Sequence, residues 1–151
     1  MIKAVLINPV AGTTRFGGVE LVADWEADKN TVIWLDINAD DEAAEEKLLK
    51  QFGIHQLAIQ DATRTRHPPK IENFDDYVFI LLRGLDAKTS GIDFGVIQLS
   101  LFVSARYLVT RHNKPSLSAE WLYAQIEQNP EKMSAVPAEL ALMLANKLVR
   151  R

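Results

Sequence analysis

The amino-acid sequence predicts an α/β domain whose mixed parallel and antiparallel sheet is covered by helices. Runs rich in β-branched and aromatic residues recur along the chain, and such runs are typical of strands. Stretches with apolar residues three or four positions apart stand between these runs and after them, which indicates amphipathic helices. Because strands and helices do not alternate one by one, a mixed sheet is favoured over a regular parallel one.

The first quarter of the chain is expected to supply three strands. An apolar run over residues 3–10 predicts the first strand. Residues 15–22 contain a pair of glycines and are expected to form a turn or bulge that leads into the second strand. Residues 24–30 are polar and are expected to form a loop or a short helical turn. Residues 31–37 form the third strand, and their consecutive apolar side chains predict burial on both faces.

Two helices are expected next. Residues 38–41 carry side chains that can accept bonds from the free N–H groups at the start of a helix. The helix that follows has apolar residues at every fourth position: Ala44, Leu48 and Phe52. Gly53 stands where a helix commonly ends. A second, shorter helix is expected over residues 55–62, and the proline pair at residues 68–69 prevents its continuation.

The second half of the chain is expected to return to strands and then to end in helices. Residues 77–82 have the strongest strand pattern. Residues 94–111 are expected to form a hairpin whose tight turn lies at residues 104–106. A helix is expected over residues 116–128. A last helix follows, in which apolar residues recur four positions apart from residue 136 onward and proline stands near the start.

The composition indicates one compact domain of an ordinary kind. The chain has 151 residues, of which 48% are hydrophobic, which is enough for a single core. A net charge of -3 gives no general attraction to nucleic acid. The absence of cysteine excludes disulfides, zinc–thiolate sites and thiol catalysis. No run reaches the roughly 20 apolar residues of a membrane-spanning helix, and the amino terminus does not have the pattern of a signal peptide.

The sequence lacks the motifs of common enzymes. Gly12 and the glycine pair at residues 17–18 are not followed by the Gly-Lys-Ser/Thr of a phosphate loop, and there is no Gly-x-Ser-x-Gly motif. The histidines are far apart, and none has the spacing of a zinc-binding pair: His55, His67 and His112. A surface or capping role is therefore favoured for each histidine.

The acidic clusters are interpreted as structural features. One cluster is expected to form a solvated helix face whose charges suit the helix dipole: Asp40, Asp41, Glu42, Glu45 and Glu46. Asp61 is expected to form a local ion pair with Arg64 or Arg66. Asp75 and Asp76 suit a turn before the next strand. One or two such acids could bind Mg²⁺ weakly, because this ion takes carboxylate oxygens and keeps several waters.

A local basic patch stands between the two halves of the chain. It consists of Arg64, Arg66, His67 and Lys70. The patch has no interleaved aromatic residues and belongs to an acidic chain, so nucleic-acid binding is disfavoured. A turn-rich loop with solvated cations is the expected structure.

Residues 52–62 read Phe-Gly-Ile-His-Gln-Leu-Ala-Ile-Gln-Asp-Ala, which resembles the CorA family of divalent-cation transporters. In that family a helix ends in Phe-Gly-(Leu/Ile)-His-Pro-Leu and continues into a Glu-Asp pair. The likeness extends to Trp-Leu-Asp at residues 34–36, to Pro-Lys-Ile-Glu at residues 69–72, to Asp-Asp-Tyr-Val-Phe-Ile-Leu-Leu at residues 75–82 and to the hairpin over residues 99–110. The motif residues that carry the resemblance are Phe52, Gly53, His55, Asp61, Pro69, Lys70, Asp76 and Tyr77.

The sequence departs from the family pattern at three positions. Gln56, Gln60 and Pro68 stand where the family usually has Pro, Glu and Arg. These positions are interpreted as structural, so the resemblance still implies the α/β/α sandwich of the family, with a mixed parallel and antiparallel sheet between helices.

The resemblance implies a non-enzymatic regulatory and metal-sensing domain of a magnesium transporter, with cobalt, nickel or zinc as other cargoes. Residues 1–151 are expected to form a single soluble N-terminal domain on the cytoplasmic face of the inner or plasma membrane. A stalk and two membrane helices are expected beyond residue 151. The implied partners are other copies of the chain, in a homopentamer, and the membrane, with no nucleic acid.

The resemblance also implies a regulatory Mg²⁺ site between neighbouring subunits. Asp86 lies near the family position that supplies one acid, and the stalk of the next subunit supplies the other. Two other functions stay open. One is a freestanding, non-catalytic interaction domain of the same fold, and the other is a small enzyme with an unrecognised site.

Overall fold

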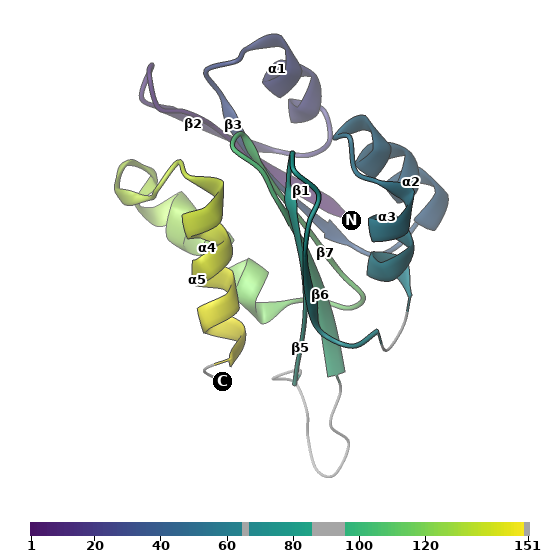
Figure 1. The fold of residues 1–151 in the computed structure, drawn as a ribbon. Coiled ribbons are helices and arrows are strands. Elements are labelled where there is room, and N and C mark those ends of the chain that lie inside the picture. The colour runs from purple at the N-terminus through teal and green to yellow at the C-terminus, as the bar shows by residue number, and fades with distance from the viewer. Residues whose placement is uncertain (65–66, 86–95, 150–151) are drawn as a thin grey trace.

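The computed structural model describes residues 1–64, 67–85 and 96–149, and it shows a seven-stranded sheet between two layers of helices (Figure 1). The strand order is β2-β1-β3-β7-β6-β5-β4. Strands β3 and β7 are parallel, whereas the other neighbouring strands pair antiparallel. The predicted fold class, a mixed sheet sandwiched between helices, is therefore confirmed.

The elements are bounded as follows. The strands are β1 (Ile2–Asn8), β2 (Thr13–Gly17), β3 (Val32–Asn38), β4 (Lys70–Asn73), β5 (Val78–Leu85), β6 (Val96–Val103) and β7 (Tyr107–His112). The helices are α1 (Leu21–Ala27), α2 (Glu42–Gln51), α3 (Gln56–Thr63), α4 (Leu117–Gln128) and α5 (Pro137–Val149), with a short 3₁₀ turn at Pro130–Lys132.

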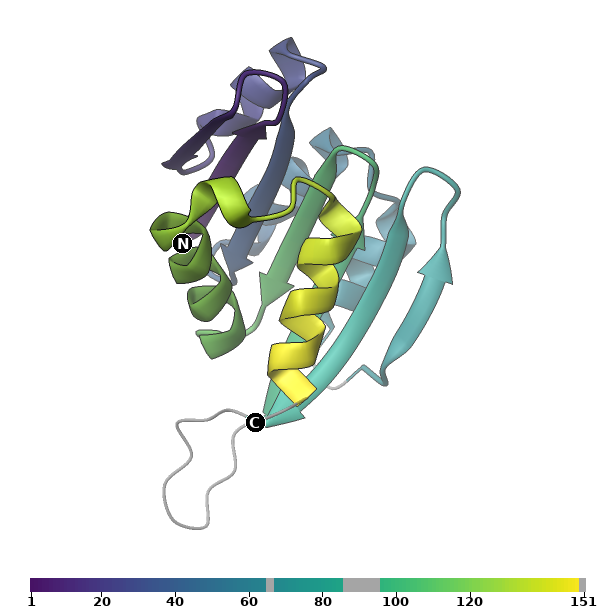
Figure 2. The same ribbon diagram turned by 90° about the vertical axis from the view of Figure 1, so that its left-hand side faces the viewer.

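Each face of the sheet has its own hydrophobic core. Helices α1, α2 and α3 cover one face, and α4 and α5 cover the other, as Figures 1 and 2 show from two directions. Strand β3 contributes to both cores, since Leu35 faces the first layer and Trp34 faces the second. The predicted burial of this strand on both faces is confirmed: neither side chain is more than 1% exposed.

Most of the expected elements are present, and their local signals act as expected. The Asp41 side chain caps α2 by accepting a hydrogen bond from the Ala44 N–H. Gly53 ends the same helix with a φ of 80°, a left-handed conformation in which glycine meets no Cβ clash. The predicted hairpin corresponds to β6 and β7, with Ser104 N–H bonded to the Tyr107 carbonyl across the turn.

One strand prediction was wrong, and one strand was missed. The second strand lies earlier than expected, over Thr13–Gly17, and Leu21 and Val22 belong to α1. They enter the core together with Trp25, because apolar residues at positions i, i+1 and i+4 share one side of a helix. Strand β4 (Lys70–Asn73) was not predicted. It pairs only with β5 at the edge of the sheet, where its charged residues are tolerated.

The acidic face of α2 is not wholly solvated, contrary to the prediction. Glu45 is 3% exposed and accepts a hydrogen bond from Arg111 Nε at 2.9 Å. Its second oxygen accepts one from the Asp40 N–H at 2.7 Å. Arg111 also donates to the Ala62 carbonyl of α3 at 3.0 Å. This buried ion pair joins two helices of the first layer to the end of β7, a contact between residues 66 positions apart.

Glu45→Ala is expected to lower the free energy of unfolding by about 3–5 kcal/mol, because it leaves the Arg111 guanidinium buried without its counter-ion. Urea unfolding followed by circular dichroism measures this loss. Glu46→Ala is the matched control, since it removes a half-exposed carboxylate of the same helix that pairs with the solvent-exposed Lys50. The Glu46→Ala variant is expected to keep the wild-type midpoint of urea unfolding. An equal loss of stability in both variants would contradict the role of Glu45.

Candidate functional site

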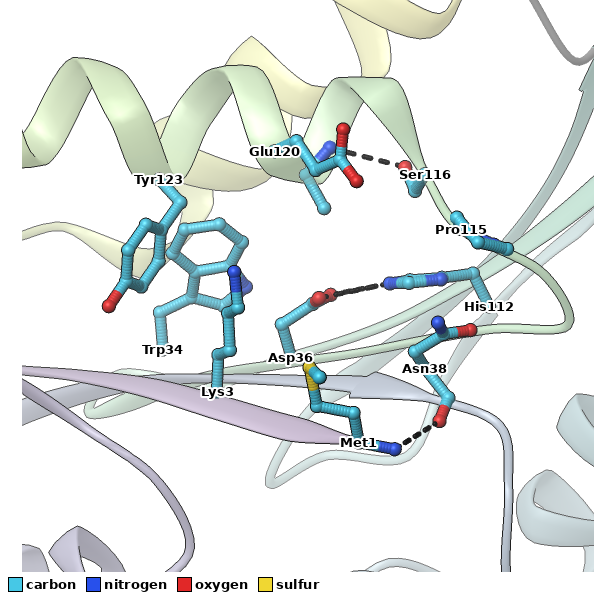
Figure 3. A pocket seen from close by; sticks show the side chains of 11 residues that line it. Met1, Lys3, Trp34, Asp36, Asn38, His112, Pro115, Ser116, Glu120 and Tyr123 are labelled. Carbon is cyan, nitrogen blue, oxygen red and sulfur yellow. Dashed lines mark hydrogen bonds and ion pairs between the residues drawn. The ribbon is translucent and has the colours of Figure 1, made fainter. Parts of the chain in front are cut away.

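A small pocket lies where β3 and β7 end beneath the start of α4 (Figure 3). We call it the His112 pocket. Its lining comes from β1, β3, β7 and α4: Met1, Lys3, Trp34, Asp36, Asn38, His112, Pro115, Ser116, Ala119, Glu120 and Tyr123. Its lining residues include a buried histidine, two carboxylates and two residues with amino groups, so it is the candidate site with the richest chemistry in the described part of the chain.

The parallel pairing of β3 and β7 brings the functional side chains together. The ends of parallel neighbours reach the same edge of a sheet, and the register sets Asp36 opposite Thr110 and Asn38 opposite His112. Asp36, Thr110 and His112 lie on the same face as Trp34, because side chains two positions apart along a strand share a face. Residues that are 76 positions apart in the sequence, Asp36 and His112, are therefore in contact.

Both ring nitrogens of His112 donate hydrogen bonds. Nε2 lies 3.0 and 2.9 Å from the two Asp36 oxygens, and Nδ1 lies 2.7 Å from the Lys114 carbonyl oxygen. A carboxylate and a carbonyl can only accept, so the geometry favours a ring that carries a proton on each nitrogen. The pair is therefore an imidazolium bonded to a carboxylate, and His112 is only 3% exposed.

Further hydrogen bonds orient the carboxylate. Thr110 Oγ1 donates to Asp36 Oδ1 at 2.5 Å, and Trp34 Nε1 donates to Thr110 Oγ1 at 3.0 Å. Thr110 and Trp34 are fully buried. The hydrogen bonds from Trp34 to Thr110 and from Thr110 to Asp36 therefore lie within the second core and end at the ion pair. Asp36 thus accepts bonds from a neutral hydroxyl and a cation, and its position is held from two sides.

The surroundings of His112 raise its pKa above the ordinary value of 6.5. Burial acts in the opposite direction and lowers the pKa, because it disfavours the charged ring. The hydrogen bond and negative charge of Asp36, together with the Lys114 carbonyl, outweigh burial. The nearby Arg111 charge lowers the pKa slightly. The direction of the shift agrees with the hydrogen-bond geometry, which also favours the charged ring.

The arrangement does not resemble a catalytic dyad. A general base needs a free lone pair, and both nitrogens of His112 are occupied as donors. The nearby hydroxyl of Ser116 accepts a hydrogen bond from the Ala119 N–H and serves as the cap of α4. Within residues 1–64, 67–85 and 96–149, no three acidic or histidine side chains form a group that could hold a metal ion. The predicted metal ligand Asp86 lies outside the described residues.

The motif residues at the end of α2 join the first helical layer to the start of β5. Phe52 packs against Trp25 and Tyr107, with ring centroids 4.9 and 5.2 Å apart. The His55 N–H donates to the Tyr77 hydroxyl at 2.8 Å. The His55 ring accepts a hydrogen bond from the Leu57 N–H and caps α3, so the capping role predicted for this histidine is confirmed.

The basic patch is not a loop of solvated cations, contrary to the prediction. Lys70 begins β4 just after Pro69, and its ammonium contacts Asp61 at 2.7 Å and Glu72 at 2.9 Å. These two hydrogen bonds raise the pKa of Lys70 above its ordinary value. Asp61 therefore pairs with Lys70, and with the His67 ring at 3.3 Å, rather than with the exposed Arg64. The other predicted partner, Arg66, lies outside the described residues.

Asp76 lies in the turn before β5, as its neighbours in the sequence suggested. Its side chain is exposed, its N–H donates to the Phe74 carbonyl, and its own carbonyl accepts from Ser104 Oγ at 2.8 Å. The preceding Asp75 has a φ of 72°, which aspartate tolerates better than most residues.

Sequence reasoning missed the partnership of Asp36 and His112. A surface or capping role was predicted for His112, and its burial beside a carboxylate shows that this prediction was wrong. A signal was available: Trp-Leu-Asp at residues 34–36 places an acid near the end of one apolar strand, and Thr-Arg-His at residues 110–112 places a histidine at the end of another. Only the parallel pairing of these two strands makes that signal informative, and the pairing was not predicted.

The charge of His112 makes stability depend on pH. Since its pKa is raised on folding, its contribution is complete below about pH 6.5 and is lost as the pH rises through the folded-state pKa. The free energy of unfolding is expected to fall by about 1.4 kcal/mol for each unit by which the folded-state pKa exceeds the ordinary one. Urea unfolding across this pH range, with His67→Gln as a control for another histidine, measures the slope.

The substitution Asp36→Asn is expected to reverse the sign of the dependence of stability on pH. Without the anion, burial dominates and lowers the pKa of His112, so stability should no longer fall with rising pH. A variant that keeps the wild-type slope would show that the slope comes from another group.

Comparison with known proteins relates this fold to a transporter family. A family model described as "CorA-like Mg2+ transporter protein" matches residues 29–151. The chain is 22% identical over 116 residues to the "Putative metal ion transporter YfjQ" of Bacillus subtilis (strain 168). The match covers 77% of this chain and 35% of that protein, so the chain spans about a third of the length of this relative.

Solved structures share the fold across nearly the whole chain. The full-length CmaX protein matches with a TM-score of 0.80 and 18% identity, over 98% of this chain and 44% of that one. The soluble domain of CorA from Methanocaldococcus jannaschii matches with a TM-score of 0.73 and 17% identity, over 97% of this chain and 56% of that one. The match of the family model to most of the chain shows that the protein belongs to the CorA-like Mg²⁺ transporter family.

Proposed function

We propose that this chain is the N-terminal regulatory and metal-sensing domain of a CorA-like transporter that carries magnesium, with cobalt, nickel and zinc as other cargoes. The observation that carries the proposal is the shared fold with the soluble domain of CorA over 97% of the chain. The family match over residues 29–151 supports the same assignment.

We also propose that this domain is one part of a longer transporter protein. The matched relatives are two to three times as long as the matched part, which leaves room for a stalk and membrane helices after residue 151. None of the helices in the described ranges is both long and apolar enough to cross a bilayer. In the proposed assembly the domain lies on the cytoplasmic face of the inner or plasma membrane, and five copies associate around one pore.

The proposed sensing mechanism uses one acid from each of two subunits. Mg²⁺ commonly takes one or two carboxylates and keeps several waters, so a shared site of this kind is chemically sufficient. Asp86 is the proposed ligand of this chain, and an acid of the neighbouring stalk is the second. The ion can regulate transport only if it binds the closed arrangement more tightly than the open one.

One surface of the domain suits contact with another part of such an assembly. Beside α5, the half-buried side chains of Val78, Ile80 and Leu82 form an apolar groove together with Leu142, which is 62% exposed. Ile71 of β4 is paired opposite Ile80 and is 76% exposed. Figure 2 shows this side of the sheet, with β4 lying to one side of α5.

Two other functions can be distinguished from this proposal by specific observations. A freestanding interaction domain would have no membrane segment after residue 151, which the full reading frame decides. An enzyme would need a free base or nucleophile, and both nitrogens of His112 in the described pocket are engaged as donors. We therefore propose a non-catalytic role.

In the longer protein that carries this domain, Asp86→Ala is expected to raise the Mg²⁺ concentration for half-maximal closure about tenfold, a typical size for one allosteric contact. Protection of the assembled protein from limited proteolysis during a Mg²⁺ titration measures closure. Asp40→Ala is the charge-matched control, because Asp40 is exposed. Identical titrations of all three proteins would contradict the role of Asp86, and identical proteolysis with and without Mg²⁺ would contradict metal sensing itself.

A further inference from the structure

The His112 pocket also controls how α4 is attached to the sheet. His112 Nδ1 donates to the Lys114 carbonyl at 2.7 Å, and that carbonyl stands two residues before Ser116. Ser116 is 2% exposed and caps α4, since its hydroxyl accepts from the Ala119 N–H at 3.1 Å. Its carbonyl accepts from the Glu120 N–H at 3.0 Å. One imidazolium therefore connects the end of β3, through Asp36, with the first turn of α4.

We propose that the His112–Asp36 pair is a proton-dependent latch that holds the start of α4 against the sheet and releases it when His112 loses its proton. The proposal goes beyond metal sensing and does not depend on it, because every contact involved lies within this chain. The ligand that controls this latch is the proton on His112.

The geometry explains why the proton matters. A neutral imidazole has one N–H and one lone pair. If Nε2 keeps its proton, the Nδ1 lone pair faces the Lys114 carbonyl oxygen; if Nδ1 keeps its proton, the Nε2 lone pair faces the Asp36 carboxylate. In either tautomer a ring-nitrogen lone pair faces an acceptor oxygen in a buried site, which is unfavourable. The loop before α4 can relieve this repulsion by moving, whereas Asp36 is held by Thr110.

Charged groups on every neighbouring element act on His112. Asp36 on β3 and Glu120 on α4 favour the protonated ring. Arg111 on β7 opposes it, and the amino terminus at Met1 and Lys3 on β1 add positive charge to the pocket lining. Lys114 in the loop favours the charged ring through its backbone carbonyl. Tyr123 on α4 also lines the pocket and is neutral at physiological pH, since burial raises its pKa. Among the charged side chains named here, only the Asp36 carboxylate bonds directly to the ring, so it dominates.

Solvent can reach the pair, and release of α4 would affect more than one turn. The pocket opens beside the ring, and the Asp36 side chain is 14% exposed. Helix α4 packs Leu122 and Ile126 into the same core as Leu140 and Leu144 of α5. A change in how α4 packs against the sheet is therefore expected to move α5 as well. Helix α5 is the last helix of the described chain and forms one wall of the apolar groove.

Amide hydrogen exchange of the 151-residue chain tests the latch. The reporters are the Ala119 and Glu120 amides, which are bonded to Ser116. Their protection, corrected for intrinsic exchange, is expected to fall relative to β5 amides between about pH 6 and pH 9, by about tenfold for each unit by which the folded-state pKa of His112 exceeds the ordinary one. In His112→Gln the protection should not change with pH. In the control His67→Gln, which alters a histidine outside the pocket, the fall should be the same as in wild type.

Nitrogen-15 shifts of the histidine rings in the wild-type chain provide a second readout that needs no variant. The latch predicts that both His112 nitrogens carry protons at about pH 6.5, and that one proton is lost over the same range in which α4 loses protection. A singly protonated ring at that pH would overturn the proposal. An undiminished pH response of Ala119 and Glu120 in His112→Gln, or protection that falls equally across all strands, would overturn it as well.

Discussion

The end of β7 carries two consecutive buried cations, and the positions of both helical layers depend on them. Arg111 and His112 point to opposite faces because successive side chains of a strand alternate. Arg111 contacts Glu45 of α2 and a carbonyl of α3, whereas His112 contacts Asp36 of β3 and the carbonyl before α4. Because an unpaired buried charge is costly, these contacts favour the observed position of each layer at this strand end.

The two faces of the sheet differ in how fully they are covered. On the α1–α3 side, Phe79 and Leu81 of β5 are completely buried, but on the α4–α5 side the intervening Ile80 remains half-buried. The less covered face is also the face whose helices are attached through the titratable pair at His112. The apolar groove proposed to contact the rest of a transporter and the proposed proton-dependent attachment of α4 thus belong to the same layer, and α5 connects them.

Local signals in the sequence were enough where each residue acts on its own neighbours. Asp41, Gly53 and His55 cap or end helices through contacts within a few residues, and they were identified correctly. Predictions failed where a distant partner decided the outcome. Glu45 looked like one more acid on a solvated helix until Arg111, 66 residues away, gave it a buried counter-ion. Strand β4 has little intrinsic β pattern and exists because β5 offers it a pairing edge.

The sequence by itself determined most of the strands and helices, the mixed character of the sheet and the family resemblance, because these depend on periodicity and on short ordered motifs. The tertiary structure alone decided the site. Asp36 and His112 are separated by 76 positions, and only the parallel pairing of β3 with β7 brings a carboxylate within 3 Å of the imidazole. The charge of a histidine depends on the groups that surround it in space, so its role could not be read from its neighbours in the chain.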